Sequence, residues 1–364
     1  MPAVRHVNGF YPWPVPVSLT DEAAVFASGG ALYRVDARMN ARRQDLAGEI
    51  TQVVQTEQGV RALTWARNGR AELVRLDERL QVLGRRQLLP GGAAPRRGME
   101  DPYDLEDWRN QREFLLLTEE DAVRLSFQAN PENGLAGALI LERTPLEGGG
   151  AVRRIIGGPE LEAALGGSCK LGYLDAGAGG ETQMWAHRDR VFLNVRLWDE
   201  NRPGSREVLF QIGGDGTVSA LWDPPEDSSG LDGRACFFDF DRDLMWTLPR
   251  PKEAGYPSER LPRCRLRARR IAPGAPAVNG LPAWEDADLY TGYFDGQLAF
   301  DGREGFRALA LDGTRSGDWT RAARNVHPIV LWRDRLLLDL EGTGRPRAYP
   351  VQFDPAAGRE LAWE

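Results

Sequence analysis

The 364-residue sequence has few of the residues that build metal sites or covalent frameworks. Its three cysteines, Cys169, Cys236 and Cys264, are far apart and form no Cys-x-x-Cys pair. This spacing argues against both a zinc site and a disulfide framework. An odd number of unpaired cysteines is typical of a reducing compartment, so we expect a cytoplasmic protein.

The familiar catalytic motifs are missing as well. The sequence contains no Gly-x-Ser-x-Gly elbow, no Gly-x-x-x-x-Gly-Lys phosphate loop and no His-Glu-x-x-His pair. Its only histidines, His6, His187 and His327, stand in separate parts of the chain. We therefore assign no catalytic residue, expect no metal, since a histidine site needs ligands that converge, and expect no cofactor.

Lysine is nearly absent, because Lys170 and Lys252 are the only two among 46 basic residues. We interpret this bias as the codon usage of a GC-rich bacterial genome. The net charge of −7 makes nucleic acid an unlikely partner, since phosphate binding needs a basic surface. Arginines at alternate positions 263–269 share one face of a strand. We interpret them as a solvated outer strand, with a phosphate or nucleic-acid patch as the alternative.

Long apolar runs are also lacking. No stretch approaches the ~18 apolar residues of a membrane span, and the N-terminus has no apolar leader region, so we expect neither a membrane segment nor a signal peptide. Residues 1–19 are instead rich in proline and aromatics, and alternate prolines allow only an edge strand. We expect this segment to pack on the rest of the fold. A proline-rich ligand for another protein is the alternative.

Short strand-length runs are what the sequence has in abundance. Residues 327–364 contain four such runs, separated by Gly, Pro or Asp. Four consecutive antiparallel strands form a sheet that cannot cover both of its own faces. The pattern therefore predicts neighbouring sheets of the same kind, as in a β-propeller, which arranges four-stranded sheets in a ring.

A hairpin pattern, an apolar run followed by a polar turn and a second apolar run, recurs along the chain. The turns are Ser28-Gly29-Gly30, Arg67-Asn68-Gly69, Glu119-Glu120-Asp121, His187-Arg188-Asp189, Asp241-Arg242-Asp243, Asp295-Gly296 and Arg333-Asp334. Seven copies give roughly 52 residues per unit, close to known propeller blades. We predict an all-β, seven-bladed β-propeller of four-stranded antiparallel blades, forming a single domain over residues 1–364. In the first two units the turn could instead join the middle strands.

Two units share a further order of residues: a Leu-Asp or Phe-Asp pair, then a glycine, then a tryptophan. The copies are Leu311-Asp312, Gly317, Trp319 and Phe353-Asp354, Gly358, Trp363. This order resembles the repeat of quinoprotein-type propellers, within the broader group of propeller and WD-like repeats. The resemblance implies a fold and no activity, because the quinone-binding residues of those enzymes have no counterpart here.

Two other stretches break the strand pattern. Residues 159–166 read as a short helix, with proline in its first turn and glycine at its end. Residues 238–243 carry alternate aspartates, but Arg242 stands where a calcium loop needs glycine, so we predict a strand ending in a hairpin.

The longest connections fall between the second and third strands of a unit or between units. In a propeller both kinds emerge on the same face, so we expect long loops on one face, where function is usually carried. The candidate binding residues on these loops are Asp101, Tyr103, Asp104, Asp107, Trp108, Glu226, Asp227 and Tyr256.

From the one-sided loops and the missing motifs we expect a non-catalytic protein–protein interaction module. It would be a scaffold subunit of a bacterial multi-protein assembly, of the kind associated with ATPases, with protein partners that the sequence does not identify. The alternative is an enzyme, a lyase or hydrolase acting on a sugar or small acid at the mouth of the central channel. Paired loop carboxylates would then supply acid–base chemistry.

Overall fold

The computed structural model describes about two thirds of the chain, including most of residues 16–222. The described residues are 5–6, 16–28, 30–66, 70–90, 113–130, 135–167, 169–175, 183–201, 205–222, 228–231, 237–240, 242–247, 249–251, 267–276, 278, 289–294, 297–302, 305–310, 315–320, 327–332, 335–339, 347–350, 359–360 and 362–363. Within these ranges no helix is long and apolar enough to cross a membrane.

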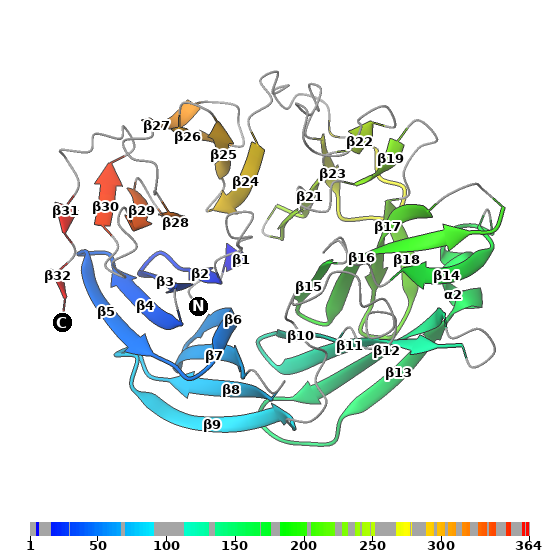
Figure 1. Ribbon diagram of the computed structural model, residues 1–364, viewed down its shortest axis with the longest axis horizontal. Coiled ribbons are helices and arrows are strands. Elements are labelled where there is room, and N and C mark those ends of the chain that lie inside the picture. The colour runs from blue at the N-terminus through cyan, green and yellow to red at the C-terminus, as the bar shows by residue number, and fades with distance from the viewer. Residues whose placement is uncertain are drawn as a thin grey trace, which may run out of the picture. The chain divides into compact units, whose positions relative to one another are not determined.

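The protein is an all-β protein, as its sequence predicts, and the described strands pair antiparallel except for β32 (Ala362–Trp363), which pairs in parallel with β5 (Asn40–Asp45). Several of its sheets have four strands (Figure 1). These features fit a propeller-like fold, whereas seven blades, a closed ring, loops on one face and a single domain stay predictions. The contacts divide the chain into two compact units.

The first unit comprises residues 1–91, 237–246 and 279–364. Its strands are β1 Arg5–His6, β2 Val17–Leu19, β3 Ala23–Ser28, β4 Ala31–Asp36, β5 Asn40–Asp45, β6 Glu49–Thr56, β7 Gly59–Trp65, β8 Ala71–Leu76, β9 Val82–Leu89, β20 Phe237–Asp239, β21 Leu244–Thr247, β24 Leu289–Phe294, β25 Gln297–Gly302, β26 Gly305–Ala310, β27 Arg315–Thr320, β28 His327–Trp332, β29 Arg335–Asp339, β30 Arg347–Pro350, β31 Arg359–Glu360 and β32 Ala362–Trp363.

Four sheets of the first unit follow the predicted meander. Their orders are β6-β7-β8-β9, β24-β25-β26-β27, β28-β29-β30-β31 and the six-stranded β1-β2-β3-β4-β5-β32. The turns after Ser28 and after residue 66 join the second and third strands of the meander, which settles the register that the sequence leaves open. The strand β1 lies at the edge of its sheet beside β2, the kind of position that the prolines of this segment allow.

The same two turn types recur in the two N-terminal sheets, β1-β2-β3-β4-β5-β32 and β6-β7-β8-β9. Thr20 and Thr56 accept backbone N–H bonds in the turn after the first strand, at 3.1–3.3 Å. Asp36 and Asp77 accept two N–H bonds each, at 2.8–2.9 Å, in the turn before the last strand. Such side chains replace water at backbone groups that the ladder leaves unpaired.

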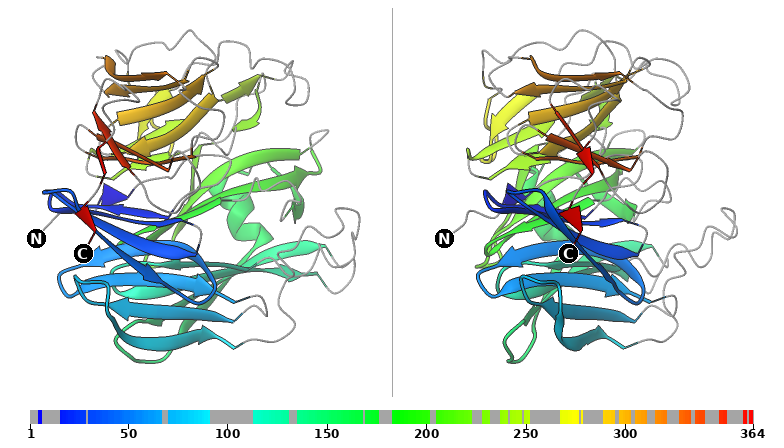
Figure 2. Two further views of the ribbon diagram at one scale, coloured as in Figure 1. Left: turned by 60° about the vertical axis from the view of Figure 1, so that its left-hand side comes forward. Right: turned by 90° about the vertical axis from the view of Figure 1, so that its left-hand side faces the viewer.

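The two N-terminal sheets pack face to face in the first unit, and Figure 2 shows strands β2 to β5 and β6 to β9 as blue and light-blue layers. The residues between them are aliphatic: Val25, Ala27, Leu32, Leu46, Ile50, Val53, Val60, Ala62, Val74, Leu76 and Leu80. The C-terminal sheet, β28-β29-β30-β31, also contacts the sheet that holds β2 and β3. The indole N–H of Trp332 donates to the Thr20 carbonyl at 2.9 Å. The last strand, β32, pairs in parallel with β5.

The second unit comprises residues 92–236 and 247–278. Its elements are β10 Glu113–Leu117, β11 Asp121–Ala129, β12 Ala136–Pro145, β13 Val152–Gly157, α2 Gly158–Ala164, β14 Leu171–Asp175, β15 Gln183–His187, β16 Arg190–Asp199, β17 Ser205–Ile212, β18 Val218–Trp222, β19 Ser228–Leu231, β22 Pro249–Pro251 and β23 Arg267–Arg270.

Strands β10 to β18 form one nine-stranded sheet, where the sequence predicts two separate four-stranded blades. The strands that the sequence pattern does not identify are β13 and β14, in the stretch 145–181 that it marks as irregular. A single residue pair, Ala136 with Leu174, joins the two halves. The short helix predicted at 159–166 is confirmed as α2, which starts one residue earlier and has proline in its first turn.

One apolar core runs beneath this sheet. It gathers Val123, Leu125, Leu139 and Leu141 from the first half, Leu161 and Leu165 from the helical segment, and Val191, Leu193, Val195, Leu197, Val208, Phe210 and Ile212 from the second half. Burial of each leucine or isoleucine contributes about 1.5–3 kcal/mol. The core therefore holds β16 and β17 firmly through one face and leaves their other face to different residues.

The strand predicted from residue 238 is β20, Phe237–Asp239, and Arg242 and Asp243 lie in a turn before β21, as the sequence predicts. The Asp239 carboxylate accepts the backbone N–H and a guanidinium N–H of Arg242, at 3.2 and 2.8 Å. Among the described residues, no group of three or more histidine, cysteine, aspartate or glutamate side chains could hold a metal ion.

Candidate functional site

The candidate binding residues on the long loops lie outside the described residues. They are Asp101, Tyr103, Asp104, Asp107, Trp108, Glu226, Asp227 and Tyr256. Their role stays a prediction. The described residues offer another candidate site, on the nine-stranded sheet of the second unit.

Strands β14, β16 and β17 place a row of charged residues side by side. Arg196 on β16 lies opposite Asp175 on β14 and opposite Glu207 on β17. The register of β14 against β16 shifts between Leu171 and Tyr173, just before this row. Residues directly opposite each other on antiparallel strands project from the same face of the sheet. The register therefore aligns an aspartate, an arginine and a glutamate across the neighbouring strands β14, β16 and β17, which Figure 1 shows in green.

This face carries buried polar residues beside apolar ones. Glu207 is 4% exposed and Asn194, two residues from Arg196 on the same face, is 0% exposed, as are Phe192 and Leu209 next to Asn194. A polar group that leaves water costs about 1–3 kcal/mol unless it is hydrogen-bonded, and a charge costs more. The alternate residues of the same strands, Val195 and Val208, belong to the apolar core. Strand alternation thus puts the buried polar residues on the face away from that core.

The two acidic residues of the row lie on strands two spacings apart. Neighbouring Cα atoms across an antiparallel pair are about 4.5–5.5 Å apart, so Asp175 and Glu207 are separated by about 10 Å at Cα. Carboxyl groups about 6.5–9.5 Å apart leave room for a substrate bond and a water molecule between them. The guanidinium between them supplies a positive charge and up to five N–H donors.

Helix α2 and the end of β16 fix the position of β14. A Glu162 side-chain oxygen accepts the backbone N–H of Leu171 at 2.8 Å, and Asp199 accepts the backbone N–H of Lys170 at 3.1 Å. Asp199 is 1% exposed, and a charged acceptor strengthens such bonds. The start of β14 is therefore anchored to both neighbours, and its register sets where Tyr173 and Asp175 lie.

An aromatic pair adjoins the charged row. Tyr173 and Trp198 lie opposite each other on β14 and β16, with ring centroids 5.9 Å apart and planes 7° apart. Trp198 is 38% exposed, in contrast to the buried Glu207. The face thus runs from buried polar residues to an exposed aromatic surface at the end where β16 turns into β17.

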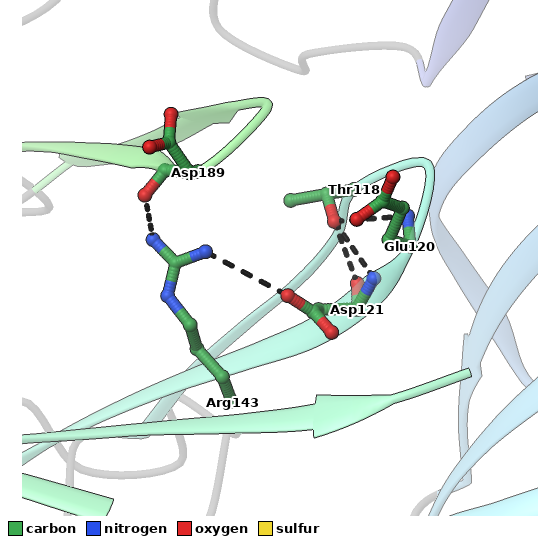
Figure 3. A network of polar contacts seen from close by, with 5 residues as sticks. All are labelled: Thr118, Glu120, Asp121, Arg143 and Asp189. Carbon is green, nitrogen blue, oxygen red and sulfur yellow. Dashed lines mark hydrogen bonds and ion pairs between the residues drawn. The ribbon is translucent and has the colours of Figure 1, made fainter. Parts of the chain in front are cut away.

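A second polar network lies at the other end of the sheet (Figure 3). Arg143 donates to the carbonyl of Asp189 in the β15–β16 turn and lies 3.6 Å from the Asp121 carboxylate. Thr118 accepts the N–H of Asp121 at 2.8 Å and that of Glu120 at 3.3 Å. Every one of these bonds joins turns or strand ends, so we assign this network to the architecture.

Part of the charged row is visible in the sequence. Of residues 190–199, Val191, Leu193, Val195 and Leu197 face the apolar core, and Arg196 lies on the opposite face with Phe192, Asn194 and Trp198. The sequence pattern does not show which residues of neighbouring strands are paired. Asp175 and Glu207 become neighbours of Arg196 only through the register of three strands.

No family model matches the chain, and no curated protein matches it. Seventy solved chains do. Among them is a Synechocystis apocarotenoid oxygenase mutant, at 9% identity and a TM-score of 0.34, with 94% of this chain and 70% of that chain covered. The AfRom2 CNH domain has 8% identity and a TM-score of 0.38, with 94% and 93% covered. A Cellvibrio cellulosa α-L-arabinanase complexed with arabinohexaose has 12% identity and a TM-score of 0.29, with 70% and 90% covered.

The expectation of a non-catalytic scaffold is wrong as the leading interpretation. Two of the similar proteins are enzymes by name, an oxygenase and an arabinanase, and they favour the alternative, an enzyme. With TM-scores below 0.4, these likenesses carry no argument about substrate or chemistry. Any proposal about the reaction therefore rests on the residues of this chain.

Proposed function

We propose that the protein is a hydrolase that cleaves a glycosidic bond, with its site on the polar face of β14, β16 and β17. The observation that carries the proposal is the strand register, which pairs two acidic residues, Asp175 and Glu207, with Arg196 from the strands on either side of it. Two carboxyl groups on opposite sides of the scissile bond are what glycoside hydrolysis requires.

The separation of the two carboxylates supports one course of reaction. Inverting hydrolases hold their two carboxyl groups about 6.5–9.5 Å apart, and retaining ones about 5–5.5 Å apart. Because a whole strand separates β14 from β17, with the Cα atoms of Asp175 and Glu207 about 10 Å apart, we propose the inverting course. One carboxyl group, in its acid form, gives its proton to the glycosidic oxygen as the C–O bond breaks. The other takes a proton from the water molecule whose oxygen bonds to the anomeric carbon.

Arg196 acts in this scheme by charge and position. Lying between Asp175 and Glu207, it offers hydrogen-bond donors to both sides of the row and to a substrate hydroxyl. It reduces the repulsion that two carboxylates would otherwise exert on each other. Asn194, fully buried on the same face, adds an amide that can both donate and accept.

A screen for hydrolysis tests the proposal. The purified protein is assayed against a panel of 4-nitrophenyl glycosides and against arabinan, xylan and cellulose by the release of reducing ends. The wild type should cleave at least one of them, and Glu207→Gln should lower kcat by about 100-fold or more, the usual contribution of an acid or base.

The matched control is Glu142→Gln. Like Glu207, which lies opposite Arg196, Glu142 on β12 lies opposite arginines, Arg124 on β11 and Arg153 on β13, but in the first half of the sheet. Its loss should leave kcat within twofold of the wild type. Hydrolysis of nothing in the panel, or equal effects of both substitutions, contradicts the proposal.

A further inference from the structure

The exposed aromatic surface beside the charged row is distinctive. The exposed large hydrophobic side chains among the described residues are Val82, Leu83, Val152, Ile155, Val278 and Trp198. Trp198 is the one aromatic residue in this group. The exposed apolar residues of β9 and β13 are aliphatic and lie on strands at sheet edges, whereas Trp198 lies on a strand with neighbours on both sides.

The ring of Trp198 is held flat by its neighbours. It stacks on Tyr173 at 5.9 Å and 7°. On the adjacent Gly172, a Cβ atom would lie 3.1 Å from Cδ1 of Trp198 and 3.3 Å from Cγ of Glu200. That contact is tighter than most side chains tolerate, so glycine at 172 lets the indole lie close against the backbone of β14. The result is a preset aromatic surface.

The surface continues the charged row in register. Trp198 is two residues from Arg196 and points to the same face, so the two Cα atoms are about 6.8 Å apart along the strand. Beyond it lies an ion pair between Lys170 and Glu200, with side chains 65% and 46% exposed. An apolar ring face is thus bordered by hydrogen-bonding groups on both sides.

We propose that Tyr173 and Trp198 form a binding platform for one sugar ring of a glycan chain, next to the ring whose bond the charged row cleaves. This inference rests on the proposed function. A sugar ring has a flat C–H face, which packs on the electron-rich face of an indole, and hydroxyl groups at its rim, which suit Arg196 and the Lys170–Glu200 pair. The substrate class is therefore an oligosaccharide rather than a single sugar or a small acid.

Oligosaccharide binding by variants of Trp198 tests the platform. The probes are arabinohexaose, xylohexaose and cellohexaose, titrated while the tryptophan fluorescence is measured. At least one should bind the wild type, and Trp198→Ala should weaken that binding at least tenfold, whereas Trp198→Phe, which keeps a ring, should lose less than threefold. Val152→Ala, a truncation of an exposed residue elsewhere in the same sheet, should bind as the wild type does. Circular dichroism and urea unfolding check that each variant is folded.

The outcomes separate this inference from the proposed function. If a hexasaccharide binds in a Trp198-dependent way and nothing is hydrolysed, the platform stands and the hydrolase does not. If hydrolysis depends on Glu207, Trp198→Ala should lower kcat/KM at least tenfold more for the hexasaccharide than for a one-ring aryl glycoside. Equal losses on both, binding that Trp198→Ala leaves unchanged, or no hexasaccharide bound at all overturns the platform.

Discussion

Gly59 is the residue at which a single methyl group should cost most in the first unit. It opens β7 with φ of +125°, a conformation that side chains rarely adopt. A Cβ atom there would lie 2.2 Å from the carbonyl oxygen of Leu76 and 2.9 Å from Cα of Asp77. Both contacts are with backbone, so β7 and β8 would have to move apart.

The cost of Gly59→Ala has two parts. The unfavourable φ costs about 1–2 kcal/mol, as for other residues outside their allowed regions. Separation of two backbone segments adds about 1–3 kcal/mol, the usual effect of overpacking. We therefore expect a loss of about 3 kcal/mol or more in the free energy of unfolding, measured by urea denaturation.

Gly30→Ala is the matched control. Gly30 also has a positive φ, +80°, but a Cβ atom there meets nothing within 4 Å. Only the conformational part remains, offset in part by the stiffer unfolded chain, so the loss should be about 1 kcal/mol. Equal losses for the two variants would refute the argument that the close approach of β7 to β8 decides the cost.

Three further predictions concern single contacts. Trp332→Phe should lower the free energy of unfolding by about 1–3 kcal/mol, because the buried Thr20 carbonyl loses its donor; a change under 0.5 kcal/mol in urea would contradict the contact between the first and last sheets. Arg143→Met should cost about 1–2 kcal/mol through the Asp189 carbonyl and the Asp121 carboxylate, whereas Arg70→Met, at an exposed ion pair with Glu72, should cost under 1 kcal/mol in the same assay. Burial raises the pKa of Asp36, but hydrogen bonds from Asn40 and the Arg38 N–H lower it more, so its pKa lies below the ordinary value. The stability that this carboxylate adds is present above about pH 4 and is lost as the pH falls through the lowered pKa, so the cost of Asp36→Asn should shrink in acid; a cost independent of pH would exclude the charge as its cause.

The antiparallel hairpins could be predicted because their information is local. In residues 183–222, apolar runs of strand length alternate with short turns, and the four predicted strands are β15 to β18. The C-terminal sheet has the same property. Period-two alternation, turn residues and run length each point to the same structure there.

Strands β13 and β14 could not be predicted in this way. The glycine-rich stretch around them, with Gly148, Gly149, Gly150, Gly166 and Gly167, indicates loop on local grounds. Pairing with β12 and β16 is a property of the assembled sheet, and tertiary context overrides weak local preference in strands. The charged row depends on this pairing, so the candidate site was missed along with the strand.

Two recurring turn sequences are present, but they do not rely on the glycine and asparagine residues that usually indicate a turn. Thr-Asp-Glu after Leu19 and Thr-Glu-Glu after Leu117 form the same turn, in which threonine accepts backbone N–H groups. Val-Asp-Ala-Arg-Met-Asn at 35–40 and Leu-Asp-Glu-Arg-Leu-Gln at 76–81 form a second shared turn, with Met39 and Leu80 at φ of 68° and 63°. A search for Gly, Asn and Asp turns overlooks the first of these, since threonine acts through its hydroxyl group.

The stereochemistry of the first product tests the central claim most directly. Proton NMR recorded during hydrolysis of the best substrate distinguishes the α from the β anomer before the two equilibrate. Because Asp175 and Glu207 lie opposite Arg196 on the two strands beside it, and so two strand spacings from each other, we predict a product of inverted configuration that Glu207→Gln no longer forms. A product of retained configuration would require carboxyl groups about 5–5.5 Å apart and would contradict it.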